Sequence, residues 1–200
     1  MRAWMPALTA FAVVALIGTA SAQTPTRVRG TIEKVDPQSM TVKSRDGRDL
    51  DIKLAENLNV SGVVNAPLSD IKPGSFVGIA ALPQADDTLK AVEVLIFPES
   101  ARGSGEGHYA WDLMPQSTMT NATVAETVTS VSGPVLTLKY KDGEKKIVVP
   151  PNTPIVTFVP GDRSLLKPGT AVFFSATPQP DGKLMAARVL AGKDGVVPPM

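Results

Sequence analysis

Internal repetition is the feature that most constrains the fold of this chain. Turn residues and apolar positions of the first half recur in the second half in the same order, 95 or 96 positions later. The matched sets, first copy and then second, are Val28, Val35 and Asp46-Gly47 with Val124, Val131 and Asp142-Gly143; Lys72-Pro73-Gly74 with Lys167-Pro168-Gly169; Pro83-Gln84 with Pro178-Gln179; and Leu89, Ala91 and Val94 with Leu184, Ala186 and Val189. We interpret this pattern as a duplication.

Each copy has the pattern of short β-strands. In the first copy Leu50, Ile52 and Leu54 alternate with charged residues, which is the period of a strand with one buried face. The Asp-Gly pairs lie between two such runs, where glycine supplies the positive φ that a tight hairpin needs. Sixteen Gly and 18 Pro, with only 5% aromatic residues, also favour short elements joined by turns.

The predicted fold class is therefore all-β, with two tandem small OB-like or Greek-key β-barrels joined by a linker that contains glycines and aromatic residues. Closure into a barrel removes the exposed strand edges that a short flat sheet would leave. A compact sandwich is the alternative. The predicted division is a signal peptide (1–22), a first β-barrel repeat (27–98), a central linker or clasp (99–122), a second β-barrel repeat (123–192) and a flexible tail (193–200).

The N-terminus has the three parts of a secretory signal peptide. Arg2 precedes an uncharged apolar stretch at 7–17, and Ala20-Ser21-Ala22 is a small-x-small cleavage site. We expect cleavage after Ala22 and a periplasmic or secreted protein. The alternative is a retained membrane anchor, but a spanning helix needs roughly 20 apolar residues. No later apolar run has that length, so no membrane association is expected after cleavage.

Charge and cysteine content exclude several classes of function. The chain has 20 basic and 19 acidic residues, and removal of the signal peptide takes away one basic residue, Arg2. A nucleic-acid-binding protein would have a basic excess, so no nucleic-acid partner is expected. There is no cysteine, which excludes thiol catalysis, thiolate metal sites and structural disulfides.

Four segments of the chain carry a family resemblance. They are Val28-Arg29-Gly30-Thr31-Ile32-Glu33-Lys34-Val35, the Asp-Gly hairpin, Leu68-Ser69-Asp70-Ile71-Lys72-Pro73-Gly74 and Leu89-Lys90-Ala91-Val92-Glu93-Val94. The chain resembles the bacterial secreted family known as domain of unknown function 5666, over roughly 27–98 and 123–192. The resemblance implies an OB-like β-barrel and brings no catalytic residues. The second copy departs from the pattern where Ala125-Glu126 replaces Arg29-Gly30.

The central segment holds the candidate functional residues. It contains the only histidine of the chain and the only tryptophan that remains after cleavage, beside three closely spaced glycines. The candidate residues are Arg102, Glu106, His108, Tyr109, Trp111 and Asp112. Two interpretations remain open. The segment is either a structural clasp that packs its apolar side chains against the barrels, or a loop that binds a ligand on a rigid scaffold.

No residue set in the sequence has a catalytic or cofactor-binding pattern. A hydrolase would need His108 as its base, and no Gly-x-Ser-x-Gly nucleophile motif is present. We therefore predict a non-enzymatic exported binding or interaction module, without cofactor, whose partner is an unidentified protein or small molecule. The alternative is a periplasmic metal-handling accessory protein that uses His108 with Glu106, Asp112, Met114 and Met119, although their spacing matches no metal-ligand pattern.

Overall fold

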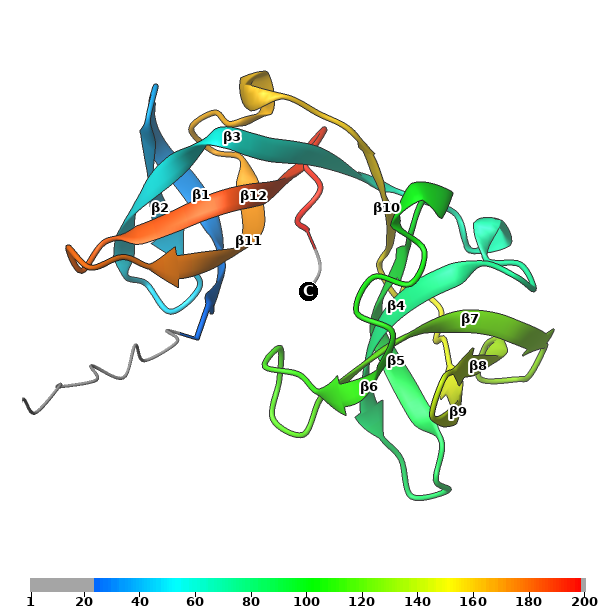
Figure 1. Ribbon diagram of the computed structural model, residues 1–200. Helices are drawn as coiled ribbons and strands as arrows, with labels where there is room; N and C mark the ends of the chain where they lie inside the picture. Colours follow the sequence, from blue (N-terminus) through cyan, green and yellow to red (C-terminus); the bar gives the residue numbers. More distant parts are fainter. Residues whose placement is uncertain (1–23, 199–200) are drawn as a thin grey trace, which may run out of the picture.

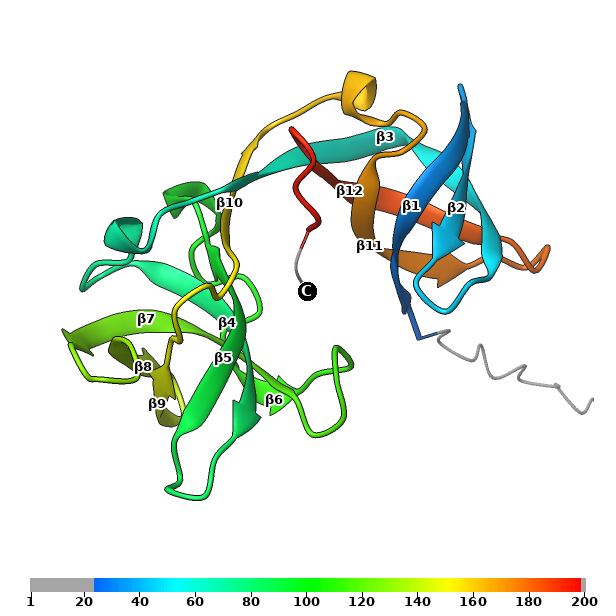
Figure 2. The same ribbon diagram turned by 180° about the vertical axis from the view of Figure 1, so that it is seen from behind.

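The computed structural model describes residues 24–198, and the predicted signal peptide lies outside the described residues. The described chain forms twelve strands and three one-turn 3₁₀ helices (Figures 1 and 2). The strands are β1 (Thr26–Asp36), β2 (Ser39–Ser44), β3 (Asp49–Asn65), β4 (Phe76–Pro83), β5 (Leu89–Ile96), β6 (Gly107–Ala110), β7 (Thr118–Val128), β8 (Val135–Tyr140), β9 (Gly143–Val148), β10 (Ile155–Pro160), β11 (Ala171–Pro178) and β12 (Leu184–Gly192). The 3₁₀ helices are η1 (Leu68–Asp70), η2 (Glu99–Ala101) and η3 (Arg163–Leu165). Within residues 24–198 no helix is long and apolar enough to span a bilayer.

Five strands of the first lobe close into a barrel, which confirms the all-β prediction. Strands β11, β1, β2 and β3 pair in that order and all antiparallel. Strand β12 closes the ring, because it pairs antiparallel with β11 and parallel with β3. The expected alternation along β3 is present: Ile52 and Leu54 are buried inside the ring. The fully buried residues of this core include Ile32, Met40, Val42, Ile52, Phe174 and Val189.

The second lobe is built from β4, β5, β7, β8 and β9. Strand β4 pairs with β5 and β7, and β8 lies between β7 and β9, all antiparallel. Strand β5 also pairs in parallel with β9 at two positions, Leu89 with Ile147 and Lys90 with Val148. A separate core fills this lobe, and its fully buried residues include Val77, Ile79, Val94, Leu136, Leu138 and Ile147.

The strand pairing does not follow the expected division of the chain into 27–98 and 123–192. The first lobe combines β1–β3 from the first half with β11 and β12 from the second half. The second lobe combines β4 and β5 with β7, β8 and β9. The length of β3 gives the physical reason. Its 17 residues extend for roughly 55 Å, so the hairpin that follows is carried out of the first ring and into the second lobe.

The end of β3 and β10 form the bridge between the lobes (Figure 1). They pair antiparallel, with Val63 directly opposite Phe158, and β10 also pairs in parallel with β5. A third group of buried residues lies at this boundary and joins the two cores. It contains Val63, Ala80, Leu95, Met119, Val156, Phe173 and Leu190.

The structure also corrects the register in which the two halves were matched. The amide of Gly74 donates to the carbonyl oxygen of Val124, and the amide of Gly169 donates to that of Ile32, both at 2.8 Å. Val124 is therefore the counterpart of Ile32, not of Val28. The loop between β7 and β8 is longer than the loop between β1 and β2, and this extra length explains why β7 matches β1 at a smaller sequence offset than the later strands do. Val131 lies in that longer loop with its side chain fully exposed, so it is not the counterpart of Val35.

The two Asp-Gly pairs form different turns. Gly47 lies in the loop between β2 and β3 with φ of 85°, as expected for the glycine of a tight hairpin. Gly143 instead begins β9 with φ of 159°, and Lys141 and Asp142 alone connect β8 to β9. Only the first hairpin therefore depends on the left-handed conformation of glycine.

The described part of the predicted flexible tail is packed against the molecule. Residues 193–198 lie on the concave side between the lobes, where they are red in Figure 1. The amide of Lys193 donates to the carbonyl oxygen of Val63 at 2.9 Å, and Val196 packs against the buried group at the lobe boundary. A side chain at Gly192 would meet the backbone of Val196, so this glycine permits the chain to turn back.

Candidate functional site

The central segment is partly a strand of the second lobe. Strand β6 pairs with the start of β7, with His108 opposite Thr120 and Tyr109 opposite Met119. Strand β7 begins at Thr118 and continues through position 122, where the segment was predicted to end. The short helix η2 precedes β6, and residues 111–117 form the loop that follows it.

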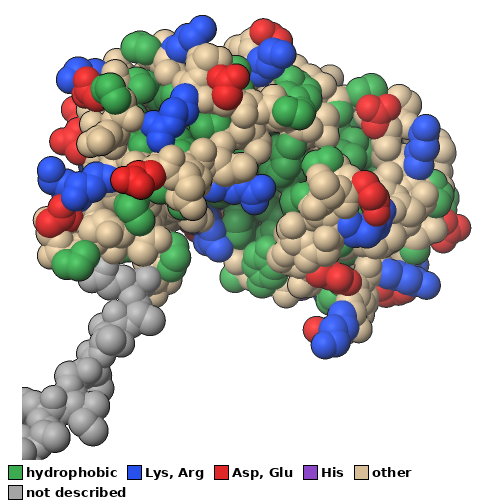
Figure 3. Space-filling model, turned by 45° about the horizontal axis from the view of Figure 1, so that its top comes forward, with side chains coloured by type: hydrophobic (Ala, Val, Ile, Leu, Met, Phe, Trp, Pro, Cys, Tyr) green, Lys and Arg blue, Asp and Glu red, His purple; other side chains and the backbone are tan. Residues whose placement is uncertain are grey.

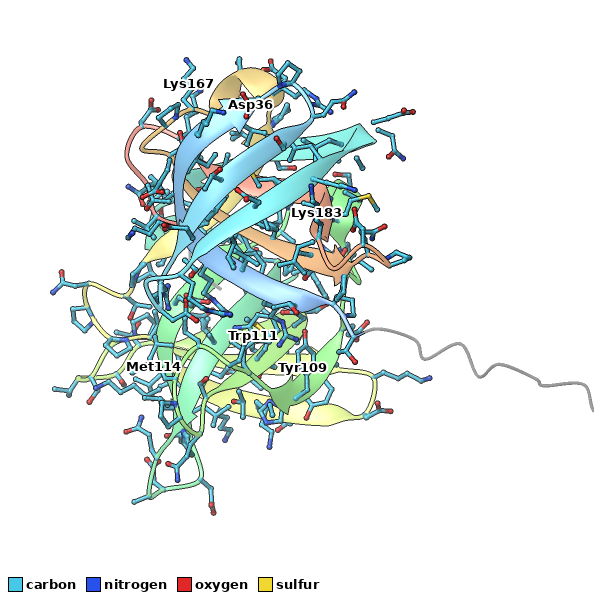
Figure 4. All side chains as sticks on the ribbon, turned by 90° about the vertical axis from the view of Figure 1, so that its left-hand side faces the viewer. Asp36, Tyr109, Trp111, Met114, Lys167 and Lys183 are labelled. Atoms are coloured by element: carbon cyan, nitrogen blue, oxygen red, sulfur yellow. The ribbon has the colours of Figure 1, made fainter. Side chains whose placement is uncertain are left out.

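Trp111, labelled in Figure 4, and the next residue, Asp112, contact arginines of the first lobe. The guanidinium of Arg27 lies 4.0 Å from the centre of the Trp111 ring. Asp112 Oδ1 accepts a hydrogen bond from Arg29 Nη2 at 2.8 Å and lies 3.5 Å from Arg27 Nη1. Partial burial opposes ionisation of Asp112, but the hydrogen bond and charge of Arg29, with the charge of Arg27, lower its pKa below the usual value. The segment thus contacts both lobes, as the clasp interpretation requires.

Trp111 is half-buried and packs against the apolar group at the lobe boundary together with Leu113. Tyr109 meets its ring edge-on, with 6.0 Å between the ring centres. Within the described part of the chain, Trp111 Nε1 is buried and has no hydrogen-bond acceptor. An unpaired buried donor reduces stability, so apolar packing and the adjacent guanidinium hold this side chain in place.

The other predicted site residues do not converge with this pair. Arg102 pairs with Glu99 and donates to the carbonyl oxygen of Gly74 at 2.8 Å. Glu106 accepts a hydrogen bond from the amide of Lys141 at 3.1 Å. These contacts attach the glycine-containing loop to the second lobe. The six residues are therefore close in sequence but make separate contacts, and they do not line one cavity.

His108 is held in a structural contact. Its Nδ1 lies 2.8 Å from Thr120 Oγ1, and its ring lies against Tyr140 with 6.4 Å between centres. Burial lowers the pKa of His108, and the positive charge of Lys145 lowers it further. Across residues 24–198, no three His, Asp or Glu side chains are grouped as metal ligands. Met119 is buried and Met114 is exposed, so the arrangement does not favour the metal-handling hypothesis, which stays untested.

An apolar pocket that the sequence did not reveal lies between the lobes (Figure 3). Its volume is about 210 Å³. Its lining is mostly aromatic and aliphatic and is contributed by β5, β10, β11, β12 and the residue after β5: Leu95, Phe97, Phe158, Phe173, Phe174, Ser175, Arg188 and Leu190. Figure 3 shows hydrophobic side chains gathered in the hollow between the lobes, with Lys or Arg side chains beside it.

Strand pairing across the lobes positions the aromatic rings of this pocket. Phe97 follows β5 and meets Phe158 of β10 edge-on, with 5.9 Å between ring centres. Phe76 also packs against Phe97, with 5.3 Å between ring centres. Phe173 of β11 comes from the first lobe, and the guanidinium of Arg29 lies 5.2 Å from its ring centre. The rings are therefore fixed by their neighbours before any ligand is present.

Arg188 is the only charged side chain in the lining of this pocket. It lies on β12, is exposed, and makes no ion pair or side-chain hydrogen bond with any residue in the described range. Ser175 is the only other polar residue in the lining. The pocket thus combines an aromatic interior with one available cation.

A larger hollow of about 480 Å³ lies among the loops of the second lobe, beside Asn65, Pro134 and Pro150–Pro154. No charged side chain lines it. It also lacks aromatic side chains, whereas ligand sites are lined mostly by hydrophobic and aromatic ones. The smaller pocket, which we call the phenylalanine pocket, is therefore the better candidate.

Comparisons with family models, with curated proteins and with solved structures gave no match for this chain. Membership of the family that the sequence resembles therefore stays a prediction.

Proposed function

We propose that this protein is a non-enzymatic interaction module whose interlobe pocket binds one large apolar side chain of a partner protein. The observation that carries the proposal is the pocket formed by Phe97, Phe158 and Phe173 with Arg188 beside it. Protein interfaces are dominated by a few anchor side chains that fill such desolvated pockets.

The size of the pocket supports a side chain over a larger ligand. Pockets for drug-sized molecules measure roughly 300–1,000 Å³, and this one has about 210 Å³. Burial of one Leu- or Phe-sized side chain contributes about 1.5–3 kcal/mol. The fixed aromatic walls make this binding free energy more favourable, because the pocket side chains lose little conformational entropy when the partner binds.

Charge complementarity supports an acidic group next to the anchor. Arg188 makes no ion pair with any residue among 24–198, and a guanidinium binds a carboxylate through two parallel hydrogen bonds. The occupant that we propose is therefore a protein segment that carries a large apolar residue followed by an acidic one. The pocket lining contains neither a histidine nor a carboxylate, which supports binding over acid–base catalysis.

We further propose that the second lobe is a second OB-like barrel and that the two lobes arose by duplication with exchange of strands. The shared order of elements supports this, because β1, β2, β3, η1, β4 and β5 are followed by β7, β8, β9 with β10, η3, β11 and β12, with the long β3 in the place of β9 and β10. Because the sequence predicts a signal peptide, we also propose that the protein meets its partner in the periplasm or outside the cell.

Binding can be tested with capped dipeptides followed by backbone amide NMR shifts. We expect leucyl-glutamate to shift the amides of Leu95, Phe97 and Leu190 saturably, with a dissociation constant on the order of 1 mM, which corresponds to about 4 kcal/mol. Alanyl-glutamate should bind more weakly because it buries less apolar area. Leucyl-lysine should bind more weakly because of its repulsion from Arg188.

A pocket-filling variant supplies the matched control. Ser175→Trp places a ring in the pocket and should abolish the response, whereas Thr177→Trp, also exposed but two residues further along β11, should leave it intact. Equal binding of leucyl-glutamate and alanyl-glutamate would contradict the proposal. Tighter binding of octanoate than of leucyl-glutamate would contradict the proposal and would indicate that the pocket binds an acyl chain.

A further inference from the structure

A second hollow, at the hairpin end of the first lobe, is lined by arginine side chains. Its volume is about 330 Å³. The arginines come from the start of β1 and from the loop between β2 and β3: Arg27, Arg29, Arg45 and Arg48. A neighbouring hollow of about 290 Å³ shares Arg29, Ser44 and Arg45 with it and adds Lys43. The two hollows therefore form one basic site, which we call the arginine pocket.

The side chains of the arginine pocket carry an excess of positive charge. Asp46 and Asp112 are the carboxylates that line it. Asp46 pairs with Arg48, and Asp112 pairs with Arg27 and Arg29. Lys43 pairs with Glu33 and Asp49, which lie outside the lining. The side chain of Arg45 makes no ion pair or hydrogen bond with any described residue. Since the chain as a whole has 20 basic and 19 acidic residues, this excess is local.

The site is also partly preorganised. Stacking on Trp111 holds the guanidinium of Arg27, and the hydrogen bond to Asp112 holds that of Arg29. Guanidinium groups that are already oriented lose little freedom when they bind a planar or tetrahedral oxyanion. The counterparts of Arg27 and Arg29 on β7 are Met119 and Asn121, as the matching of Ile32 with Val124 shows. The second lobe therefore has no equivalent site.

We infer that the arginine pocket binds an oxyanion, the carboxylate or phosphate group of a small ligand. Arg45 supplies the available guanidinium, and Arg27 and Arg29 supply the positive field. This inference does not depend on the phenylalanine pocket, because the two sites have different linings and share no residue.

The test is a titration of the full chain with inorganic phosphate and, separately, with succinate, at constant ionic strength and followed by amide NMR shifts. We expect saturable shifts at residues 44–48. Arg45→Gln should raise the dissociation constant about tenfold or more, because the loss of one hydrogen bond to a charged group changes a dissociation constant by about a factor of ten. Arg45 has no side-chain contact with the described residues, so the variant should keep its fold.

Lys167→Gln is the matched control, because it also removes one positive charge and lies at the end of the first lobe away from Trp111 (Figure 4). It should leave binding unchanged. A response to phosphate alone identifies a phosphate ligand, and a response to succinate alone identifies a carboxylate. The absence of saturable shifts with both anions, or equal weakening in Arg45→Gln and Lys167→Gln, overturns the inference. Phe158→Ala removes a wall of the phenylalanine pocket on β10, away from β1, and should retain anion binding. A failure of the phenylalanine pocket is thereby distinguished from a failure here.

Discussion

The two lobes share an order of strands but present different side chains at their common boundary. Arg188 on β12 occupies the position that Glu93 occupies on β5, and Phe173 occupies the position of Gly78. Glu93 is 6% exposed, whereas Arg188 is exposed. A Cβ atom at Gly78 would lie only 3.0 Å from the ring of Phe97. At the boundary, the space beside Gly78 in the second lobe is therefore filled by Phe97, whereas the space beside Phe173 and Arg188 in the first lobe remains open as the phenylalanine pocket.

The lobes also differ at the position of Arg29 and Asn121. Arg29 lines an open basic hollow. Asn121 is 7% exposed and donates to the carbonyl oxygen of Ser104 at 3.0 Å, beneath the glycine-containing loop. The central segment thus contacts this position in both lobes, through Asp112 in the first and through Ser104 in the second, and only the first lobe keeps a basic hollow beside it. This difference teaches that a shared backbone plan leaves function to a few side chains and to the central segment.

The largest expected effect tests whether the lobes are thermodynamically separate. Ile52→Ala in the first core and Leu138→Ala in the second each remove a fully buried side chain and should reduce the free energy of unfolding by about 2–5 kcal/mol. Because strands of both halves build each lobe, both variants should shift one common transition in chemical denaturation monitored by circular dichroism.

Val128→Ala, at a residue that is 49% exposed, is the control and should change stability by less than about 0.5 kcal/mol. Two separate transitions, each moved by only one of the core variants, would show that the lobes unfold independently.

The next effect concerns the contact between the lobes through the central segment. Trp111→Ala should reduce the free energy of unfolding by about 2–3 kcal/mol, less than for a fully buried tryptophan because the side chain is half-buried. His108→Ala should lose about 1 kcal/mol, the worth of its contact with Thr120. In the chain that begins at Gln23, Trp111 is the only tryptophan, so the fluorescence reports on this side chain alone. Because Trp111 packs at the lobe boundary, its emission should be blue-shifted and protected from quenching by iodide. Water-exposed emission with unchanged stability would contradict the clasp.

The smallest effect compares the two hairpins. Gly47→Val should destabilise by about 1 kcal/mol, since a β-branched residue resists the left-handed conformation that Gly47 adopts. Gly143→Val should cost less, because Gly143 lies at the start of β9 with a nearly extended φ. Thermal denaturation of both variants measures the difference. Equal losses would mean that the two turns have the same requirement for glycine.

Local patterns predicted the elements of this fold well. The alternation of Leu50, Ile52 and Leu54 correctly predicted a strand with one buried face, and the Asp-Gly pair at Gly47 correctly predicted a hairpin. Both features depend on residues a few positions apart, where side-chain period and backbone conformation act directly. The aromatic content of the central segment left a clasp and a ligand-binding loop open, and the packing contact of Trp111 comes from the structure.

The sequence alone thus determined an all-β chain with its strands and its first tight turn. The tertiary structure decided which strands pair. Because the two halves have similar patterns, β12 of one half fits beside β3 of the other, and local periodicity contains no information that distinguishes the partners. The phenylalanine pocket follows from that choice. Phe97, Phe158 and Phe173 are far apart in the sequence, and they meet only because the long β3 and β10 join the lobes.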